Sequence, residues 1–487
     1  ASAPMLFHTW TFLLFFAVFY PVYLLIKGTR LKLPWLLTAS YVFYGWWNPV
    51  YLILIVWATL VDYLAVVGMA RTRWKKPWLV LSLLNNLSLL GFFKYGRFVV
   101  ENLNSLAAWL GLPWTLGDPD VRFLSDAVNS LLYGCGIDHT VPAFSYLLPV
   151  GISFYVFQSM SYTIDYYRGN VAFEPNFVRY ATFVSLFPQL VAGPIERASN
   201  LLPQLHGTPQ ITRDDVSDGG FLFVVGLFKK VALADYLARY VDPIYASPGD
   251  YQAAALALAT VAFAWQIYFD FSGYTDMARG IGRMMGIRLM LNFYHPYLAT
   301  GLGDFWQRWH ISLSTWFKDY VYIPLGGNRH GEVATYRNMV LTMLISGLWH
   351  GAMWTFVIWG AVHAAGRVLT RALEGTPFYQ HRVPKLAKQV LTFLIVCFAW
   401  VFFRAQSVGD AWLILRRIAS CELADPAIPL LMIGLVLAIW IYQYVWESRL
   451  YAVLQRPLVR VALVVGMVVY IATLITASDQ AFIYFQF

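Results

Sequence analysis

The chain has 487 residues, of which 59% are hydrophobic and only 13% are charged. Soluble globular proteins carry about 25% charged residues, so this composition excludes an ordinary soluble enzyme. An aromatic content of 18% also excludes a disordered chain. The formal net charge of +9 is typical of a membrane protein whose cytoplasmic loops are basic.

A helix that crosses a membrane needs roughly 20 mostly apolar residues, so the chain has room for about ten to twelve such helices joined by short loops. We therefore expect an all-α polytopic membrane protein. The first apolar run lacks a basic leader and a small-residue cleavage site, so we expect the first helix to be retained.

Closely spaced apolar runs open the chain, at about 9–26, 33–47, 49–70 and 77–93. Basic residues lie in two of the connecting loops, from Lys27 to Lys32 and from Arg71 to Lys76, whereas the segment 95–140 is mainly acidic. Cytoplasmic loops carry an excess of Lys and Arg. Both basic loops are therefore predicted to be cytoplasmic, and the N-terminus and the acidic segment are predicted to face outward.

The later apolar runs are less regular, and polar residues interrupt many of them. They lie at about 142–167, 178–193, 219–234, 252–271, 337–361, 363–372, 386–403, 428–446 and 458–476. Between 270 and 330 the chain holds many charged residues among many aromatic ones. Irregular charged backbone at membrane depth occurs where protein or a wet cavity surrounds it, so we interpret 270–330 as re-entrant or interfacial helices around a central funnel.

We treat residues 1–487 as a single integral-membrane domain. It is divided into N-terminal helices with an outward-facing loop (5–140), a core (142–372) and C-terminal helices (386–487).

The segment 304–320 has the spacing of one amphipathic helix, with a wide aromatic face and a polar face. Asp304 is placed to cap its N-terminus and to pair with Arg308 one turn later. His310 falls at the boundary between the two faces. From the residues alone, an interfacial helix with a boundary histidine is the simpler interpretation, and a functional histidine is the alternative.

His350 lies inside the apolar run 337–361, between the small residues Gly347 and Gly351. Ionisable side chains at membrane depth are expensive and commonly mark a functional site. The small neighbours would allow close approach of another helix or a ligand. A buried histidine bonded to a carbonyl is the structural alternative.

Several familiar chemistries are absent from the sequence. It has no phosphate-binding loop, no G-x-S-x-G elbow and no H-E-x-x-H zinc helix. The glycines from Gly280 to Gly286 fit helix packing better than dinucleotide binding. Cys135, Cys397 and Cys421 are too scattered for a disulfide framework, so we expect free thiols, with no metal site and no permanently bound cofactor.

Five motifs in order along the chain resemble those of the membrane-bound O-acyltransferases. They are LPVGISFYVFQ (148–158), FPQLVAGPIER (187–197), YFDFSGYTD (268–276), the segment 305–329 around RWHISLSTW, and GLWHG (347–351). The resemblance extends over roughly 5–415 and includes the C-terminal segment 480–487. Within the family, the chain is most similar to the bacterial alginate O-acetyltransferase branch.

The resemblance implies a multi-pass protein of a bacterial inner membrane that takes acetyl groups from a cytosolic thioester, such as acetyl-CoA or an acylated carrier. The acceptor would be an exported polysaccharide such as alginate, reached directly or through an extracytoplasmic acetyltransferase partner. His350 matches the family's essential histidine, and His310 matches its second histidine. The candidate funnel-lining residues are Trp306, Arg308, Trp309, Ser314, Asp319, Asn328, Ser346 and Trp349.

Two other hypotheses remain open at this stage. One keeps the acyl transfer and changes the acceptor to cellulose, peptidoglycan or teichoic acid, the last with D-alanyl in place of acetyl. The other is a transporter of an acylated intermediate, in which the histidines relay protons without bond chemistry.

Overall fold

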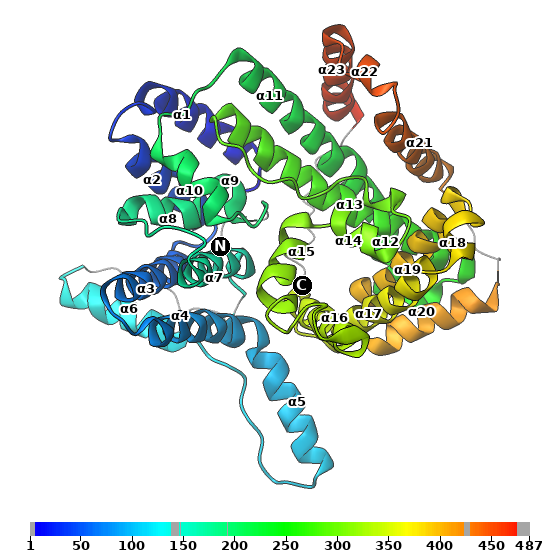
Figure 1. Cartoon of the computed structure of the whole chain (residues 1–487), viewed down its shortest axis with the longest axis horizontal. Coiled ribbons are helices and arrows are strands. Elements are labelled where there is room, and N and C mark those ends of the chain that lie inside the picture. The colour runs from blue at the N-terminus through cyan, green and yellow to red at the C-terminus, as the bar shows by residue number, and fades with distance from the viewer. Residues whose placement is uncertain (1–4, 138–145, 147, 192, 423–428, 475–487) are drawn as a thin grey trace. The chain divides into compact units, whose positions relative to one another are not determined.

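The computed structural model describes residues 5–137, 146, 148–191, 193–422 and 429–474. Throughout these ranges the regular secondary structure is helical, which confirms the all-α prediction (Figure 1). The end of the acidic segment 95–140, the start of the run at 142 and the motif at 480–487 lie outside the described residues. The three cysteines are free, as expected.

The chain forms two compact units, one of Val50–Pro175 and one of Ala1–Pro49 together with Asn176–Phe487. The boundaries of these units differ from the subdivision expected from the sequence, because the unit Val50–Pro175 combines N-terminal helices with the first part of the expected core. The single-domain assignment itself stays a prediction.

The unit Val50–Pro175 is built on three packed helices, which a buried polar cluster joins. Asp62 accepts hydrogen bonds from Ser82 (2.6 Å), Asn86 (2.8 Å) and Ser159. Each of these four residues is fully buried, and the bonds satisfy a carboxylate that would otherwise be costly inside a helical core. The helices of this unit are η1 (Pro49–Tyr51, at the boundary), α3 (Leu52–Arg71), α4 (Lys75–Leu90), η2 (Gly91–Tyr95), α5 (Gly96–Trp109), α6 (Arg122–Gly134) and α7 (Ile152–Arg168).

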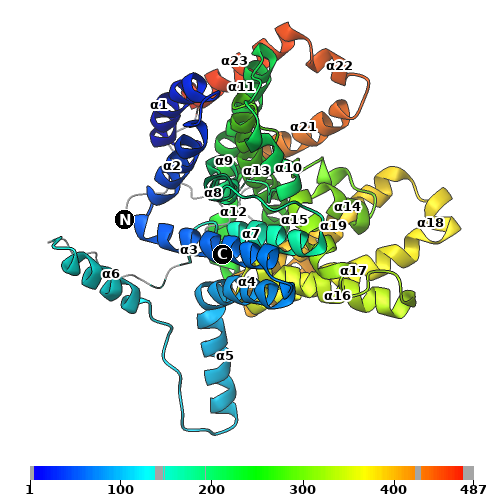
Figure 2. The ribbon, with the colours of Figure 1, turned by 60° about the vertical axis from the view of Figure 1, so that its left-hand side comes forward.

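The larger unit begins with α1 and α2 and continues from α8 onward (Figure 2). Its helices are α1 (Trp10–Ile26), α2 (Lys32–Gly45), α8 (Phe177–Ser185), α9 (Phe187–Leu190), α10 (Ala198–His206), α11 (Arg213–Leu227), η3 (Phe228–Ala234), α12 (Asp235–Ala246), η4 (Pro248–Asp250), α13 (Ala253–Met284), η5 (Pro296–Leu298), α14 (Leu302–Arg308), α15 (Ile311–Phe317), η6 (Lys318–Tyr322), α16 (Gly331–His350), α17 (Trp354–Glu374), α18 (Pro377–His381), α19 (Lys385–Arg404), α20 (Val408–Ser420), α21 (Leu430–Trp446), α22 (Tyr451–Leu454) and α23 (Pro457–Leu474).

Helices α11 and α13 lie in close backbone contact at two glycine pairs. A Cβ atom at Gly280 would lie 2.6 Å from the carbonyl oxygen of Gly219, and one at Gly273 would lie 2.7 Å from that of Gly226. Only glycine permits such close approach, since any larger side chain would force the helices apart. The helix-packing interpretation of Gly280 is therefore confirmed.

Two expected element boundaries are wrong. Helix α13 continues through the change in composition at 270 and ends at Met284, so the irregular segment begins later than expected. The run 337–361 is two helices rather than one, because α16 ends at His350 and α17 begins at Trp354. A Cβ atom at Gly360 would lie 2.5 Å from the carbonyl oxygen of Met343, so these two helices pack tightly against each other.

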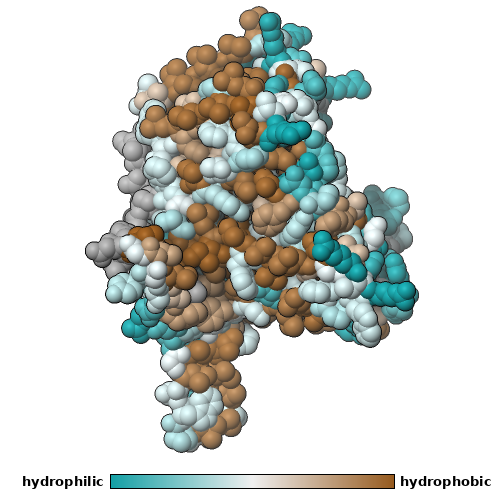
Figure 3. Space-filling model, turned by 90° about the vertical axis from the view of Figure 1, so that its left-hand side faces the viewer, coloured by the Kyte–Doolittle hydropathy of each residue, from teal (hydrophilic) through white to brown (hydrophobic). Residues whose placement is uncertain are grey.

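Among the described helices, four are long and apolar enough to cross a membrane: Pro49–Arg71, Lys75–Trp109, Ala253–Met284 and Lys385–Arg404. Apolar side chains cover much of the face shown in Figure 3. Helix α1, for example, exposes Trp10, Leu14 and Leu25. Extended apolar surface is typical of contact with lipid or a partner. The expected count of about ten to twelve spans stays a prediction.

Candidate active site

His310 stands at a sharp break between α14 and α15, so the single helix expected over 304–320 is wrong. Its backbone is left-handed, with φ 42° and ψ 55°. The neighbouring segment supplies the hydrogen bonds that a continuous helix would have made. Tyr294 N–H donates to the Arg308 carbonyl at 2.9 Å, and Ile311 N–H donates to the Asn292 carbonyl at 2.9 Å. Tertiary partners thus replace helical bonds on both sides of His310.

The predicted ion pair in front of this break is confirmed. Arg308 Nε lies 2.6 Å from Asp304 Oδ1, and the second carboxylate oxygen accepts the Thr300 N–H at 3.1 Å. Arg308 also reaches Glu447 at 2.9 Å, directly after α21. Arg308 therefore ties α14 to a distant segment.

The ring of His310 is completely buried among aromatic side chains. Its centroid lies 4.7 Å from that of Phe271 in an edge arrangement and 6.1 Å from that of Trp349. Its Nδ1 atom lies 3.1 Å from Asn292 Oδ1. Burial lowers the pKa of His310 to about 3, so its imidazole is neutral at pH 7.

His350 is the last residue of α16 and is 4% exposed. Its ring centroid lies 5.0 Å from that of Trp349, 4.9 Å from Trp359 and 5.3 Å from Phe403. The Trp349 ring is therefore a neighbour of both histidines, although His310 and His350 lie 40 residues apart in the sequence. The structure brings His310, Trp349 and His350 together in one aromatic cluster.

Sequence reasoning missed His363, which is fully buried on α17. Its ring centroid lies 4.6 Å from that of Trp359 and 5.0 Å from that of Trp306. The signal that singled out His350, an ionisable residue in an apolar run, could also have found His363. Asn292 was missed as well, and nothing in its local sequence marks it.

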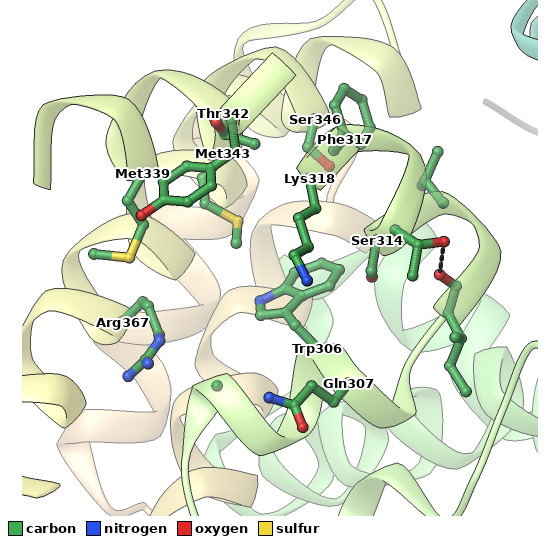
Figure 4. Close-up of a pocket in the computed structure, with 15 residues that line it drawn as sticks. Trp306, Gln307, Ser314, Phe317, Lys318, Met339, Thr342, Met343, Ser346 and Arg367 are labelled. Atoms are coloured by element: carbon green, nitrogen blue, oxygen red, sulfur yellow. Dashed lines mark hydrogen bonds between the residues drawn. The ribbon is translucent and has the colours of Figure 1, made fainter. Parts of the chain in front are cut away.

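A pocket of about 460 Å³ lies beside this cluster, between α14, α15, α16 and α17 (Figure 4). Neither histidine lines it, but Ile311 follows His310 and Ser346 lies one turn before His350. The walls are mostly apolar, and Lys318 and Arg367 contribute positive charge. The lining residues are Gly303, Trp306, Gln307, Ile311, Leu313, Ser314, Thr315, Phe317, Lys318, Tyr322, Met339, Thr342, Met343, Ser346 and Arg367.

Three of the candidate funnel-lining residues, Trp306, Ser314 and Ser346, line this pocket. The others lie elsewhere. Trp309 is 1% exposed and packs in the aromatic core. Asp319 forms an ion pair with Arg197 at 3.0 Å.

Asn328, another candidate funnel-lining residue, is exposed in the loop after η6 and does not line the pocket, whereas Ser346 does.

Comparison with known proteins gives this cluster a family context. Residues 172–408 match the model of MBOAT, the membrane-bound O-acyltransferase family. This stretch contains His310, His350 and every residue that lines the pocket.

Curated relatives extend the match beyond that stretch. The chain is 42% identical over 407 residues to Probable alginate O-acetylase AlgI of Pseudomonas aeruginosa, covering 82% of this chain and 72% of the relative. It is 36% identical over 429 residues to Peptidoglycan O-acetyltransferase of Helicobacter pylori, covering 81% and 76%. It is 25% identical over 271 residues to Teichoic acid D-alanyltransferase of Bacillus subtilis, covering 53% and 69%. The chain therefore belongs to the membrane-bound O-acyltransferase family and is an acyltransferase.

Proposed function

We propose that the protein takes acetyl groups from a cytosolic thioester donor and transfers them across the membrane for O-acetylation of an exported polysaccharide such as alginate. The observation that carries this proposal is the convergence of His310 and His350 on Trp349 beside a pocket. The 42% identity to a relative named as an alginate O-acetylase supports the acetyl group and the acceptor class.

Acyl transfer from a thioester to a hydroxyl needs a base for the hydroxyl proton and donors for the developing oxyanion. In the proposed reaction the acceptor oxygen attacks the thioester carbonyl carbon, a C–O bond forms and the C–S bond breaks. His350 takes the proton of the hydroxyl, and that proton ends on the departing thiolate. His310 orients the reactants or passes the proton on, and Ser346 or a backbone amide stabilises the oxyanion.

The aromatic surroundings favour this chemistry. Burial keeps the His310 imidazole neutral at pH 7, so one ring nitrogen keeps a lone pair that can accept a hydrogen bond from a reactant. Indole and phenyl rings exclude water from the cluster, which protects the thioester from hydrolysis and strengthens local electrostatic interactions.

The proposed geometry requires a donor on the cytosolic face of an inner membrane and an acceptor outside. Acetyl either passes directly to the polymer or is relayed through an extracytoplasmic acetyltransferase partner. The pocket between α14, α15, α16 and α17 supports a substrate cavity and is compatible with both routes.

Peptidoglycan is the second candidate acceptor, because a relative named as a peptidoglycan O-acetyltransferase is 36% identical over 429 residues. D-alanyl transfer to teichoic acid has weaker support, since the named relative shares 25% identity over a shorter stretch. Membership of an acyltransferase family speaks against a transporter without bond chemistry.

Release of free thiol from acetyl-CoA by the purified protein in detergent tests the proposal. The reaction is run with alginate oligosaccharides, with peptidoglycan fragments and with an extracytoplasmic partner supplied as acceptor, and the labelled acetyl group is followed onto each. Acceptor-dependent release, with label on alginate or on the partner, supports the proposal. Label on peptidoglycan alone moves the assignment to the second acceptor, and no turnover in any combination contradicts acetyl-CoA-dependent transfer.

A further inference from the structure

Asn292 is a buried residue whose side-chain oxygen faces His310. It is 0% exposed, and its Oδ1 atom lies 3.1 Å from His310 Nδ1, 3.2 Å from the Ser312 backbone nitrogen and 3.0 Å from Ser312 Oγ. Through these three contacts, the side-chain amide of Asn292 binds both His310 and Ser312.

The contact with the Ser312 backbone fixes which atom of the amide faces His310. A backbone N–H can only donate, so the amide atom that it meets must be the oxygen rather than the nitrogen. Ser312 Oγ is consistent with this orientation, because it accepts from Ile195 N–H at 3.1 Å and keeps its own hydrogen for Asn292.

An oxygen at this position requires His310 Nδ1 to be the donor. A neutral imidazole carries one ring hydrogen, so protonation of Nδ1 leaves the lone pair on Nε2. The neutral form is the one that burial favours, since the low pKa of His310 keeps the ring uncharged at pH 7.

Asn292 also holds the backbone of the same turn. Its carbonyl accepts the Ile311 N–H at 2.9 Å, directly after the left-handed residue His310. A left-handed backbone is uncommon for a residue other than glycine and persists where surrounding contacts determine it. One residue therefore restrains both the main chain and the ring orientation of His310.

We propose that Asn292 is a positioning residue that holds His310 in the Nδ1–H tautomer, so that Nε2 is the ring atom through which His310 orients the reactants or passes the proton on in the acyl transfer. The inference rests on the proposed function, because it assigns a proton-transfer role to His310. It goes beyond that function by naming the tautomer, the reactive ring atom and the residue that sets both.

Two substitutions at Asn292 separate positioning from packing. Asn292→Leu removes the acceptor at similar volume, and we expect kcat to fall about 10²-fold or more with the KM for acetyl-CoA unchanged. Asn292→Asp keeps an acceptor for both His310 and Ser312, so we expect kcat within about tenfold of wild type. Ser312→Ala is the matched control, since it removes a neighbouring bond to Asn292 and leaves the His310 contact in place.

Nitrogen NMR of protein labelled in its histidines reads the tautomer without an activity assay and without an Asn292 variant. The His310 signal is assigned by its loss in His310→Ala. A proton on Nδ1 in the wild-type protein supports the inference, and a proton on Nε2 overturns it. Wild-type kcat in a folded Asn292→Leu protein, or equal losses in the Leu and Asp variants, also overturns it.

The same experiments distinguish this inference from the proposed function. Near wild-type turnover by a folded His310→Ala protein removes His310 from the reaction and with it the basis of the inference. An inactive His310→Ala protein beside a fully active Asn292→Leu protein overturns only the positioning role.

Discussion

Lys230 and Asp270 form a buried ion pair, with 2.6 Å between Lys230 Nζ and Asp270 Oδ1 and side-chain exposures of 1% and 3%. Asp235 lies 2.9 Å from the same ammonium group and is 5% exposed. The pair joins η3 to α13, the helix that carries the close glycine contacts with α11. Charges this deeply buried require partners, because an isolated one would carry a large desolvation cost.

Replacement of Lys230 by Met should lower the free energy of unfolding by about 3–5 kcal/mol, because it leaves two buried carboxylates without their counter-ion. Lys229→Met is the control, since its pair with Asp276 is more exposed, at 23% and 14%. Thermal unfolding in detergent measures both. The double variant Lys230→Met with Asp270→Asn should recover part of the loss. A Lys230→Met protein as stable as the Lys229→Met protein would contradict the structural role of the pair.

Glu196 links pH to stability. It is buried, accepts hydrogen bonds from Met290 N–H and Asn200, and burial nevertheless raises its pKa to about 7. A folded-state pKa above the unfolded value means that the folded protein binds this proton more tightly. The stabilisation is therefore complete below the ordinary pKa of 4.5 and is lost as the pH rises through about 7.

Glu196→Gln should remove this contribution, because the amide is neutral at every pH. The variant also loses one hydrogen-bond acceptor oxygen, which changes its stability by an amount that does not depend on pH. The melting temperature of the variant relative to wild type should therefore rise between about pH 5 and pH 8. Glu101→Gln, at an exposed carboxylate, serves as the control. A relative melting temperature that stays constant across this range would remove Glu196 from the pH response.

Membrane topology can be tested at three exposed positions, Gly28, Thr72 and Gly117. The first two lie in the basic loops and the third in the acidic segment, so the charge rule predicts opposite sides of the membrane. Single cysteines at Gly28 and Thr72, in a cysteine-free background, should resist an impermeant thiol reagent applied to intact spheroplasts. A cysteine at Gly117 should react.

The reverse labelling pattern would place the basic loops outside and invert the expected orientation. A cytosolic donor would then meet the wrong face of the protein. Lysed spheroplasts supply the accessibility control, since all three cysteines should react there.

Local features of the site could be predicted from the sequence, because they depend on neighbouring residues. The Asp304–Arg308 pair follows from helical spacing, and the close packing around Gly280 follows from small residues on one helix face. The break at His310 could not be predicted in this way. It depends on backbone partners at Asn292 and Tyr294, which only the tertiary fold brings alongside.

The role of Asn292 shows the same limit. Asn292 lies 18 residues before His310 in the sequence, and only its 3.1 Å distance from the His310 ring and its bond to Ser312 in the folded chain indicate a role. The sequence does single out His350, because an ionisable residue in an apolar run is unusual. Its position at the end of α16, rather than within a span, emerged only from the structure.

The acetyl-transfer rate of purified His350→Ala protein, corrected for its folded fraction, tests the central claim most directly. A catalytic base contributes roughly 10²–10⁴-fold to a rate, so acetyl transfer should fall by at least the lower figure. Expression and thermal stability should stay close to wild type, and His310→Ala should be equally or less impaired. Near wild-type acetyl transfer by the His350→Ala protein, or its failure to fold, would contradict the catalytic assignment and leave His350 as a structural residue.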